Sequence, residues 1–198
     1  PAGPPQTRAA QARGRGMAAN DQHSMKHAAA LRAAAEVRDG MVVGLGTGTT
    51  AALAIRALAA RVAGGLRIQG IPTSREAAAL ARRLGVPLTS FARHRRLDLT
   101  IDGADQAERG TLNLIKGLGG ALLREKLVAS ASARMIVVID QTKLVDRLCA
   151  ATPLPVETTT FGWQVALHWL AALGCAPTLR PVAVHPFATD GGNRIADC

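Results

Sequence analysis

The sequence predicts an α/β protein with a doubly wound, mostly parallel sheet, followed by a small and apparently incomplete α+β domain. Short apolar runs alternate with helical segments through the first 140 residues, which requires right-handed crossovers between parallel strands. Several of these runs end in loops rich in Gly, Thr or Asp, and the carboxyl ends of parallel strands are where sites form. After Pro153 the pattern changes to one helix and two short strands. The main domain is therefore expected to be Rossmann-like.

The elements follow from apolar periodicity and from Gly, Pro and Asp at the breaks. We expect helices at 25–38, 51–62, 75–84, 119–132 and 162–173, and strands at 41–45, 66–71, 97–101, 135–139, 178–184 and 194–196. Ser74 is the expected N-cap of the third helix. Residues 1–24 lack periodicity and predict a disordered basic extension; the domains are then 25–150 and 151–198.

The composition excludes several classes of protein. The chain has 24 Lys and Arg against 14 Asp and Glu, a net charge of +10. This charge suits either a polyanion or a small anionic substrate, and we favour the second because the arginines are scattered. Aromatic residues make up 3%, too few for stacking single-stranded nucleic acid. No apolar run reaches the roughly 18 residues of a membrane helix. Three distant cysteines predict neither disulfides nor a zinc site, and favour the cytoplasm.

A glycine-rich turn, Gly44-Leu45-Gly46-Thr47-Gly48-Thr49-Thr50, joins an expected strand to an expected helix. Small residues let backbone N–H groups approach an anion, and a helix N-terminus favours negative charge. The turn is not a dinucleotide fingerprint, because Thr49 stands at the sixth position and no acidic residue ends the next strand. We interpret it as a phosphate loop; the alternative is a tight turn without a ligand.

The ionisable residues of the centre of the chain form the second motif. Asp102 and Asp105 flank two small residues after a strand, Lys116 follows a short apolar run, and Glu125 lies early in a helix. Each alone suits a turn or a solvated surface, but together they supply what proton transfer on a small polar substrate needs. Lys143 also follows a strand. The histidines lack metal-ligand spacing, so we expect no metal and no cofactor.

Taken together these motifs are similar to those of the ribose-5-phosphate isomerase family, type A. The matching stretches are Val43–Thr50, Ile101–Asp105, Leu114–Lys126, Asp140–Lys143 and Pro153–Glu157, and the resemblance covers about residues 25–197. It implies isomerisation of ribose 5-phosphate to ribulose 5-phosphate through an enediolate in the pentose phosphate pathway. It also implies a homodimer if the fold is intact, with a sugar phosphate as the partner and neither nucleic acid nor membrane.

The resemblance also implies roles for single residues. Glu125 is expected to carry the proton between C1 and C2, and Asp102 and Asp105 to serve ring opening and hydroxyl binding. Lys116 and the glycine-rich backbone after it are expected to stabilise the enediolate oxygen. The expected substrate-binding residues are Thr47, Gly48, Thr49, Thr50, Gly103, Ala104, Gly117, Leu118, Gly119, Lys143 and Lys26.

The chain departs from the family pattern at a few places. Gln106 stands where Glu is usual, Thr49 replaces Ser, and Leu118 interrupts a run of glycines, where a left-handed backbone would be strained. The family also continues for about a helix and several strands, so a truncated small domain, an unpaired sheet edge and uncovered apolar surface are expected. Two alternatives stay open: a catalytically impaired relic, and a sugar-phosphate-sensing module of the same fold.

Overall fold

The computed structural model describes the backbone of residues 8–182 and 185–198, and side chains from residue 21 onward. The main domain contains, in order, α1 (Arg8–Ala35), β1 (Val42–Leu45), α2 (Thr49–Ala63), β2 (Gln69–Pro72), α3 (Arg75–Arg83), β3 (Leu99–Asp102), β4 (Gln106–Glu108), β5 (Leu114–Ile115), α4 (Leu122–Ser130), β6 (Met135–Val137), the 3-10 helix η1 (Gln141–Lys143) and β7 (Leu144–Val145). The segment expected to form the small domain, called the small domain below, contains β8 (Pro155–Thr158), α5 (Trp163–Ala172), β9 (Thr178–Leu179), β10 (Pro181–Val182), β11 (His185–Pro186) and β12 (Arg194–Asp197).

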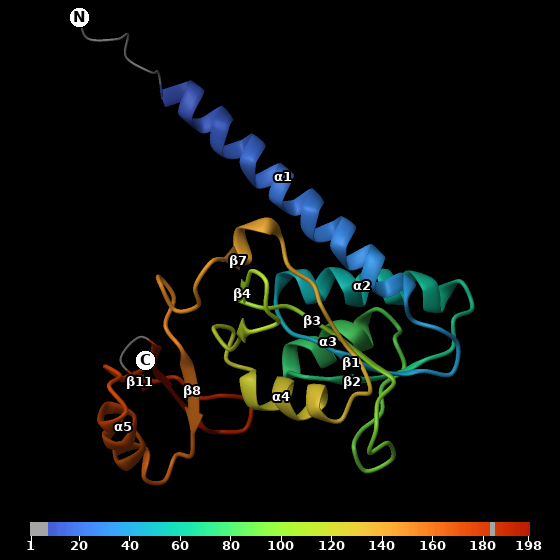
Figure 1. Cartoon of the computed structure of the whole chain (residues 1–198). Helices are drawn as coiled ribbons and strands as arrows, with labels where there is room; N and C mark the ends of the chain where they lie inside the picture. The colour runs from blue at the N-terminus through green and yellow to red at the C-terminus, as the bar shows by residue number, and fades with distance from the viewer. Residues whose placement is uncertain (1–7, 183–184) are drawn as a thin grey trace, which may run out of the picture.

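The main sheet has the strand order β2-β1-β3-β6, and all of its pairings are parallel. The chain moves from β1 through α2 to β2 in one direction, and from β3 through α4 to β6 in the other. Right-handed crossovers then place α2 and α4 on opposite faces of the sheet, as Figure 1 shows. The order reverses between β1 and β3, which confirms the predicted doubly wound fold and marks the usual position of a binding crevice.

The core lies between the sheet and the helices α1, α2 and α3. Its largest fully buried apolar side chains are Leu45, Ile55, Leu58, Ile101, Val37 and Val43. The expected N-cap is confirmed, because the Ser74 hydroxyl accepts a hydrogen bond from Ala77 N at 3.0 Å. This cap fixes where α3 begins, beside the pocket described below.

The N-terminal part differs from the sequence prediction. We expected disorder through residue 24, yet α1 begins at Arg8 and projects from the body of the molecule (Figure 1). Residues 1–7 lie outside the described residues. The segment is rich in Ala, Gln and Arg, which favour helix, so the helix of residues 25–35 extends toward the N-terminus without needing an apolar face.

A second small sheet, β5-β4-β7, was not predicted beyond the short apolar run before Lys116. Its strands have two or three residues each, too short for a periodic pattern. β4 pairs antiparallel with β5 and parallel with β7. This sheet carries the chain from Asp105 back to the site at Lys116.

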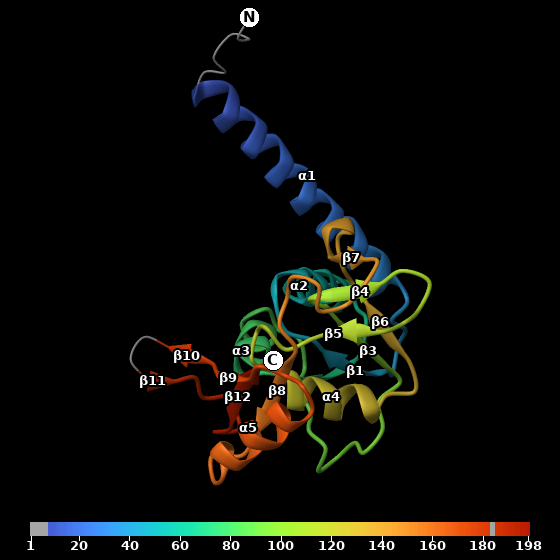
Figure 2. The ribbon, with the colours of Figure 1, turned by 60° about the vertical axis from the view of Figure 1, so that its left-hand side comes forward.

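The small domain contains the antiparallel sheet β8-β12-β9, with the β10–β11 pair and α5 beside it. In Figures 1 and 2 it lies next to α4, and Leu123 N donates a hydrogen bond to Glu157 Oε2 of β8 at 3.2 Å. None of the residues of α5 is buried. Phe161, Val165, Trp169 and Leu173 recur every four residues and are exposed, so they form an apolar stripe.

An apolar groove lies between α4 and β8. The groove, of about 630 Å³, is lined by apolar side chains that include Leu112, Leu122 and Leu154. β6 forms one edge of the main sheet. Among the described residues, no helix is both long and apolar enough to cross a membrane.

Candidate active site

A pocket of about 160 Å³ lies at the carboxyl ends of β1 and β3, where the strand order reverses. It is lined by Lys26, Thr47, Gly48, Thr49, Thr50, Gly103, Ala104, Asp105, Lys116, Gly117, Gly119, Glu125, Ile139 and Lys143. All the residues predicted for the site are therefore on its wall except Asp102 and Leu118. The loops that follow separate strands converge as their position at the carboxyl ends of the strands predicts.

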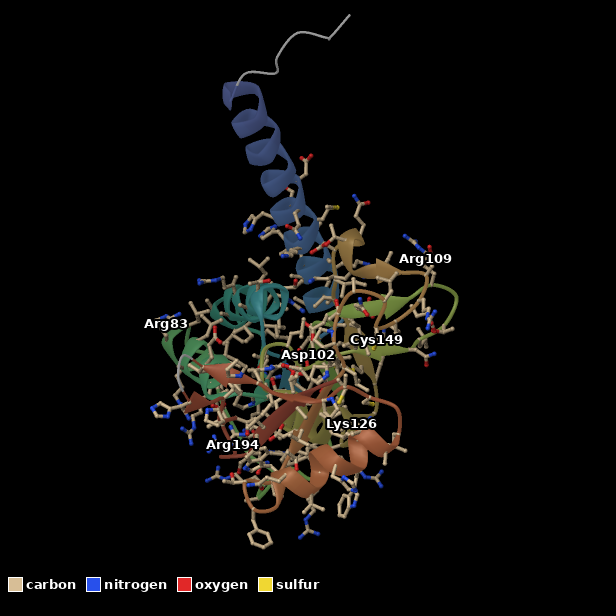
Figure 3. The ribbon with its side chains drawn as sticks, turned by 90° about the vertical axis from the view of Figure 1, so that its left-hand side faces the viewer. Arg83, Asp102, Arg109, Lys126, Cys149 and Arg194 are labelled. Atoms are coloured by element: carbon tan, nitrogen blue, oxygen red, sulfur yellow. The ribbon has the colours of Figure 1, made fainter. Side chains whose placement is uncertain are left out.

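Asp102 lies behind the pocket wall. Its side chain is fully buried at the end of β3 and near the centre of the molecule in Figure 3. One carboxylate oxygen accepts hydrogen bonds from Thr47 N (3.0 Å) and Gly103 N (2.8 Å). The other lies 2.9 Å from Lys116 Nζ. Through these contacts the buried carboxylate joins the two pocket loops to the lysine.

The loop after β1 passes so close to Asp102 that only glycine fits at position 46. A Cβ built on Gly46 would lie 2.2 Å from Asp102 Oδ1, closer than any real contact. Gly46 N also donates to Ile101 O at 2.9 Å, which holds the loop against β3. The position therefore requires glycine for space rather than for backbone freedom.

Lys116 is placed at the end of β5 and joins both carboxylates of the site. Its Nζ donates to Asp102 Oδ2 (2.9 Å) and to the carbonyl of Gly103 (2.5 Å), and lies 3.1 Å from Glu125 Oε2. Burial lowers the pKa of Lys116, but the charges of Asp102 and Glu125 more than offset this and hold the pKa above its usual value. Lys116 is therefore an ammonium ion at neutral pH.

Glu125 differs from Asp102 in its hydrogen bonding. Glu125 lies in the first turn of α4 and is 5% exposed. Burial and then the charge of Asp102 raise the pKa of Glu125 to about 7, although Lys116 opposes them. Oε2 contacts Lys116 at ion-pair distance but accepts no hydrogen bond of good geometry. A carboxylate that titrates near neutrality and is not saturated with donors suits a general base.

The N-terminus of α2 forms the anion-binding end of the pocket. Gly48 is its N-cap and has no side chain to satisfy the first N–H groups of the helix. These groups and the helix dipole favour a negative charge at this end, where Thr49 and Thr50 also line the pocket. The structure therefore supports the interpretation of this turn as an anion-binding loop.

Thr47 contributes differently from its neighbours. Its hydroxyl is 2.7 Å from Thr73 Oγ1 and donates to Ser74 Oγ at 2.8 Å. Since Ser74 caps α3, this network ties the loop to the next helix rather than leaving the hydroxyl free for a ligand.

Two lysines flank this end, and Asp140 holds one of them. Lys26 comes from α1 and Lys143 from η1. Lys26 Nζ lies 3.6 Å from Asp140 Oδ2, and Asp140 also accepts from Thr142 N at 2.9 Å to cap η1. Burial raises the pKa of Asp140, but hydrogen bonds from Thr142 and Gln22 and the charge of Lys26 hold it below its usual value. Asp140 was not predicted as a site residue.

In the glycine-rich loop after Lys116, Leu118 does not adopt the left-handed backbone conformation that would strain it. Positive φ angles fall on Gly117 (113°) and Gly120 (79°), whereas Leu118 is outside the left-handed region. Leu118 is 42% exposed and its N–H donates to Asp105 Oδ2 at 3.0 Å. Leu118 is not among the residues that line the pocket, and its expected contact with substrate stays a prediction. Gly119 does line the pocket.

Gln106, which stands where the family usually has Glu, is buried and does not reach the pocket. Its Oε1 accepts a hydrogen bond from Cys149 N at 2.9 Å, and Cys149 has φ of 60°. Cys149 lies in the segment between β7 and β8, and Figure 3 labels it below Arg109. All three cysteines of the chain are free thiols.

Among the described residues, no group of three or more His, Cys, Asp and Glu is placed to hold a metal ion. The charged groups at the pocket are cations at the phosphate-loop end and a carboxylate–ammonium–carboxylate row at the other. This arrangement suits a small anion that carries a carbon acid at its opposite end. The expected homodimer and the cytoplasmic location stay predictions.

The sequence was compared with those of known proteins. A sequence model described as "Ribose 5-phosphate isomerase A (phosphoriboisomerase A)" matches residues 69–198. The chain is 53% identical over 185 residues to ribose-5-phosphate isomerase A of Gluconobacter oxydans, covering 92% of this chain and 80% of that protein. It is 54% identical over 178 residues to the protein of the same name from Gloeobacter violaceus, covering 90% and 77%.

Solved structures give the same result. Ribose 5-phosphate isomerase A of Methanocaldococcus jannaschii superposes with a TM-score of 0.85 at 39% identity, covering 89% of this chain and 79% of that one. A D-ribose-5-phosphate isomerase in complex with phospho-erythronic acid superposes with a TM-score of 0.83 at 37% identity, covering 88% and 78%. The resemblance found in the sequence is confirmed, and the chain belongs to the ribose 5-phosphate isomerase A family.

Proposed function

We propose that this chain interconverts D-ribose 5-phosphate and D-ribulose 5-phosphate, as an aldose–ketose isomerase of the non-oxidative pentose phosphate pathway. The observation that carries the proposal is the pairing of Glu125, whose pKa is about 7, with Lys116 in one pocket. The relatives named ribose-5-phosphate isomerase A support the choice of substrate, as does the complex of one relative with phospho-erythronic acid. A relic and a sensing module need no such base, so neither alternative is favoured.

The substrate is oriented by the two ends of the pocket. Its phosphate binds the N-terminus of α2 with Thr49 and Thr50, between the ammonium groups of Lys26 and Lys143. C1 and C2 then face Glu125 and Lys116. Of the two aspartates, Asp105 is on the wall and serves ring opening and hydroxyl binding, whereas Asp102 positions Lys116 from behind.

The reaction moves one proton between carbons. Glu125 takes the proton from C2 of the open-chain aldose, and the electron pair of that C–H bond forms the C1=C2 double bond. The negative charge collects on O1, where the Lys116 ammonium and the N–H groups of the glycine-rich loop stabilise it. Return of the proton to C1, with transfer of the O2 hydroxyl proton to O1, gives the ketose.

The test is ketose formation from ribose 5-phosphate by the purified chain and by Glu125→Gln. We expect the wild type to be active and the variant to lose about 10²–10⁴-fold in kcat, the usual contribution of a general base. Glutamine keeps the shape, so the variant is expected to bind ribose 5-phosphate. Near-normal turnover in the variant excludes Glu125 as the base, and an inactive wild type that still binds the sugar phosphate favours the relic or the sensing module.

A further inference from the structure

Arg180, which lies between β9 and β10, connects the small domain to the active site. Its guanidinium donates hydrogen bonds from Nη1 to the carbonyl oxygens of Gly117 (3.0 Å) and Leu118 (2.9 Å). These carbonyls belong to the glycine-rich loop that follows Lys116. Arg180 is more than 60 residues away in sequence and does not line the pocket.

Three contacts hold Arg180 in place. Its Nε donates to Asp197 Oδ2 at 2.8 Å, and its Nη2 pairs with Asp197 Oδ1 in a bidentate contact. The guanidinium carbon lies 5.9 Å from the centroid of the Phe187 ring. Phe187 in turn lies where a side chain on Gly120 would be, 2.5 Å from an added Cβ. The side chain of Arg180 is only 13% exposed, so its fork is fixed in one orientation.

Because the peptide group is planar, the hydrogen bonds from Arg180 to two carbonyl oxygens also set the direction of the N–H groups that follow them. In a trans peptide, C=O and the next N–H point in opposite directions. When Arg180 holds the Gly117 carbonyl, Leu118 N–H points the other way, and it indeed donates to Asp105 Oδ2 at 3.0 Å. The same geometry at the Leu118 carbonyl turns Gly119 N–H away from the small domain, and Gly119 lines the pocket.

We propose that Arg180 is a positioning residue for the isomerisation: it turns two peptide groups of the Gly117–Gly120 loop so that their N–H groups serve Asp105 and the developing oxyanion. This rests on the proposed function. The cation also polarises both peptide groups, which makes their N–H groups better donors. Through Arg180, which does not line the pocket, the small domain thus contributes to the positioning of the catalytic loop.

The test compares Arg180→Met with the matched control Arg194→Met. Methionine keeps an apolar stem of similar length but removes the donors and the charge. Arg194, labelled in Figure 3, also donates to backbone carbonyls, but to Pro186 and Phe187 of the small domain itself. Measured quantities are kcat and KM for ribose 5-phosphate, the inhibition constant of phospho-erythronic acid, the affinity for inorganic phosphate, and hydrogen exchange at the Leu118 and Gly119 amides.

We expect Arg180→Met to lower kcat about 10- to 100-fold, a part of what loss of an oxyanion donor costs, with KM within about threefold. Phospho-erythronic acid, whose planar carboxylate resembles the enediolate, is expected to lose affinity by a similar factor. Phosphate affinity is expected to be unchanged, and exchange at the two amides to rise. Arg194→Met is expected to match the wild type within about twofold.

Three results overturn the proposal: unchanged exchange at both amides in Arg180→Met, a loss of phosphate affinity as large as the loss of kcat, or an equal effect of Arg194→Met. Exchange does not depend on activity, so this readout separates failure of the positioning role from failure of the proposed function. If Arg180→Met does not fold, Asp197→Asn keeps the arginine but weakens its hold. In Asp197→Asn, kcat is expected to fall about three- to tenfold with the same pattern in the other measurements. If Asp197→Asn behaves like the wild type, the proposal is overturned.

Discussion

The two sides of the pocket are held in different ways. On the strand side, Thr47 and Gly103 follow the parallel strands β1 and β3. Their N–H groups donate to the buried carboxylate of Asp102, which ends β3. On the loop side, the Gly117–Gly120 loop belongs to no strand. One turn hydrogen bond, from Gly120 N to Gly117 O, and the side chains of Asp105 and Arg180 hold it. The side built from main-chain hydrogen bonds is expected to be rigid, and the other to depend on distant residues.

The first prediction concerns a variant without Lys116, the residue that links the two sides of the pocket. Lys116 contacts Asp102 on the strand side and Glu125 on α4, so Lys116→Met leaves two buried carboxylates without their shared cation. We expect kcat/KM to fall about 10²–10³-fold through loss of the oxyanion donor. Breaking a buried ion pair is also expected to cost about 3–5 kcal/mol of stability. Steady-state kinetics and urea unfolding measure the two effects.

Glu125→Gln is the control for this variant, since it removes one charge of the row but leaves Lys116 with Asp102. A Lys116→Met enzyme that keeps more than about a tenth of wild-type kcat/KM contradicts the role of the ammonium in the reaction.

The second prediction concerns the pH dependence of kcat, which depends on Glu125 of α4. Its base form is the carboxylate, and its pKa is raised from 4.5 to about 7, so it gains activity as the pH rises through 7. Below that value kcat is expected to fall about tenfold per pH unit, and above it to level off. An ordinary glutamate would give a flat profile down to about pH 5.5.

Rates are measured from pH 5 to 9 at saturating substrate, because the phosphate of the substrate also titrates near 6 and affects KM. A level kcat between pH 5.5 and 8 contradicts the assignment of a perturbed Glu125 as the base.

The third prediction affects the strand side alone. Gly46→Ala places a Cβ 2.2 Å from Asp102 Oδ1, and both residues are buried. Overpacking of this kind is expected to cost about 1–3 kcal/mol, seen as a lower urea midpoint. Gly64→Ala is the matched control, because its Cβ would have no neighbour closer than 3.4 Å and its φ of −85° suits alanine. Equal stability of the two variants would show that the strand side is not as tightly packed as described.

Much of the strand side is predictable from sequence because its signals are local. The apolar runs before Gly46 and Asp102 and the capping serine at Ser74 each predict their element within a few residues. The convergence of these loops then follows from the topology of parallel sheets. The role of Asp102 is not predictable in this way, since a carboxylate at the end of a strand gives no sign of whether it lies on the pocket wall or behind it.

The loop side is less predictable because its contacts are long-range. Leu118 looked like a source of strain, but the positive φ angles fall on its glycine neighbours. Arg180 belongs to none of the motifs found in the sequence, and Asp140 begins a matching stretch that assigned it no role. The roles of both depend on pairings over many residues. The helix from Arg8 was missed because helix propensity, rather than an apolar face, extends it.

The central claim is that Glu125 carries a proton between C2 and C1, and isomerisation in D₂O tests it most directly. A proton held by a carboxylate exchanges with solvent, so ribulose 5-phosphate formed by the wild type is expected to contain deuterium at C1, and Glu125→Gln to form almost none. Complete retention of the substrate hydrogen at C1, together with an unchanged rate in Glu125→Gln, would contradict the account.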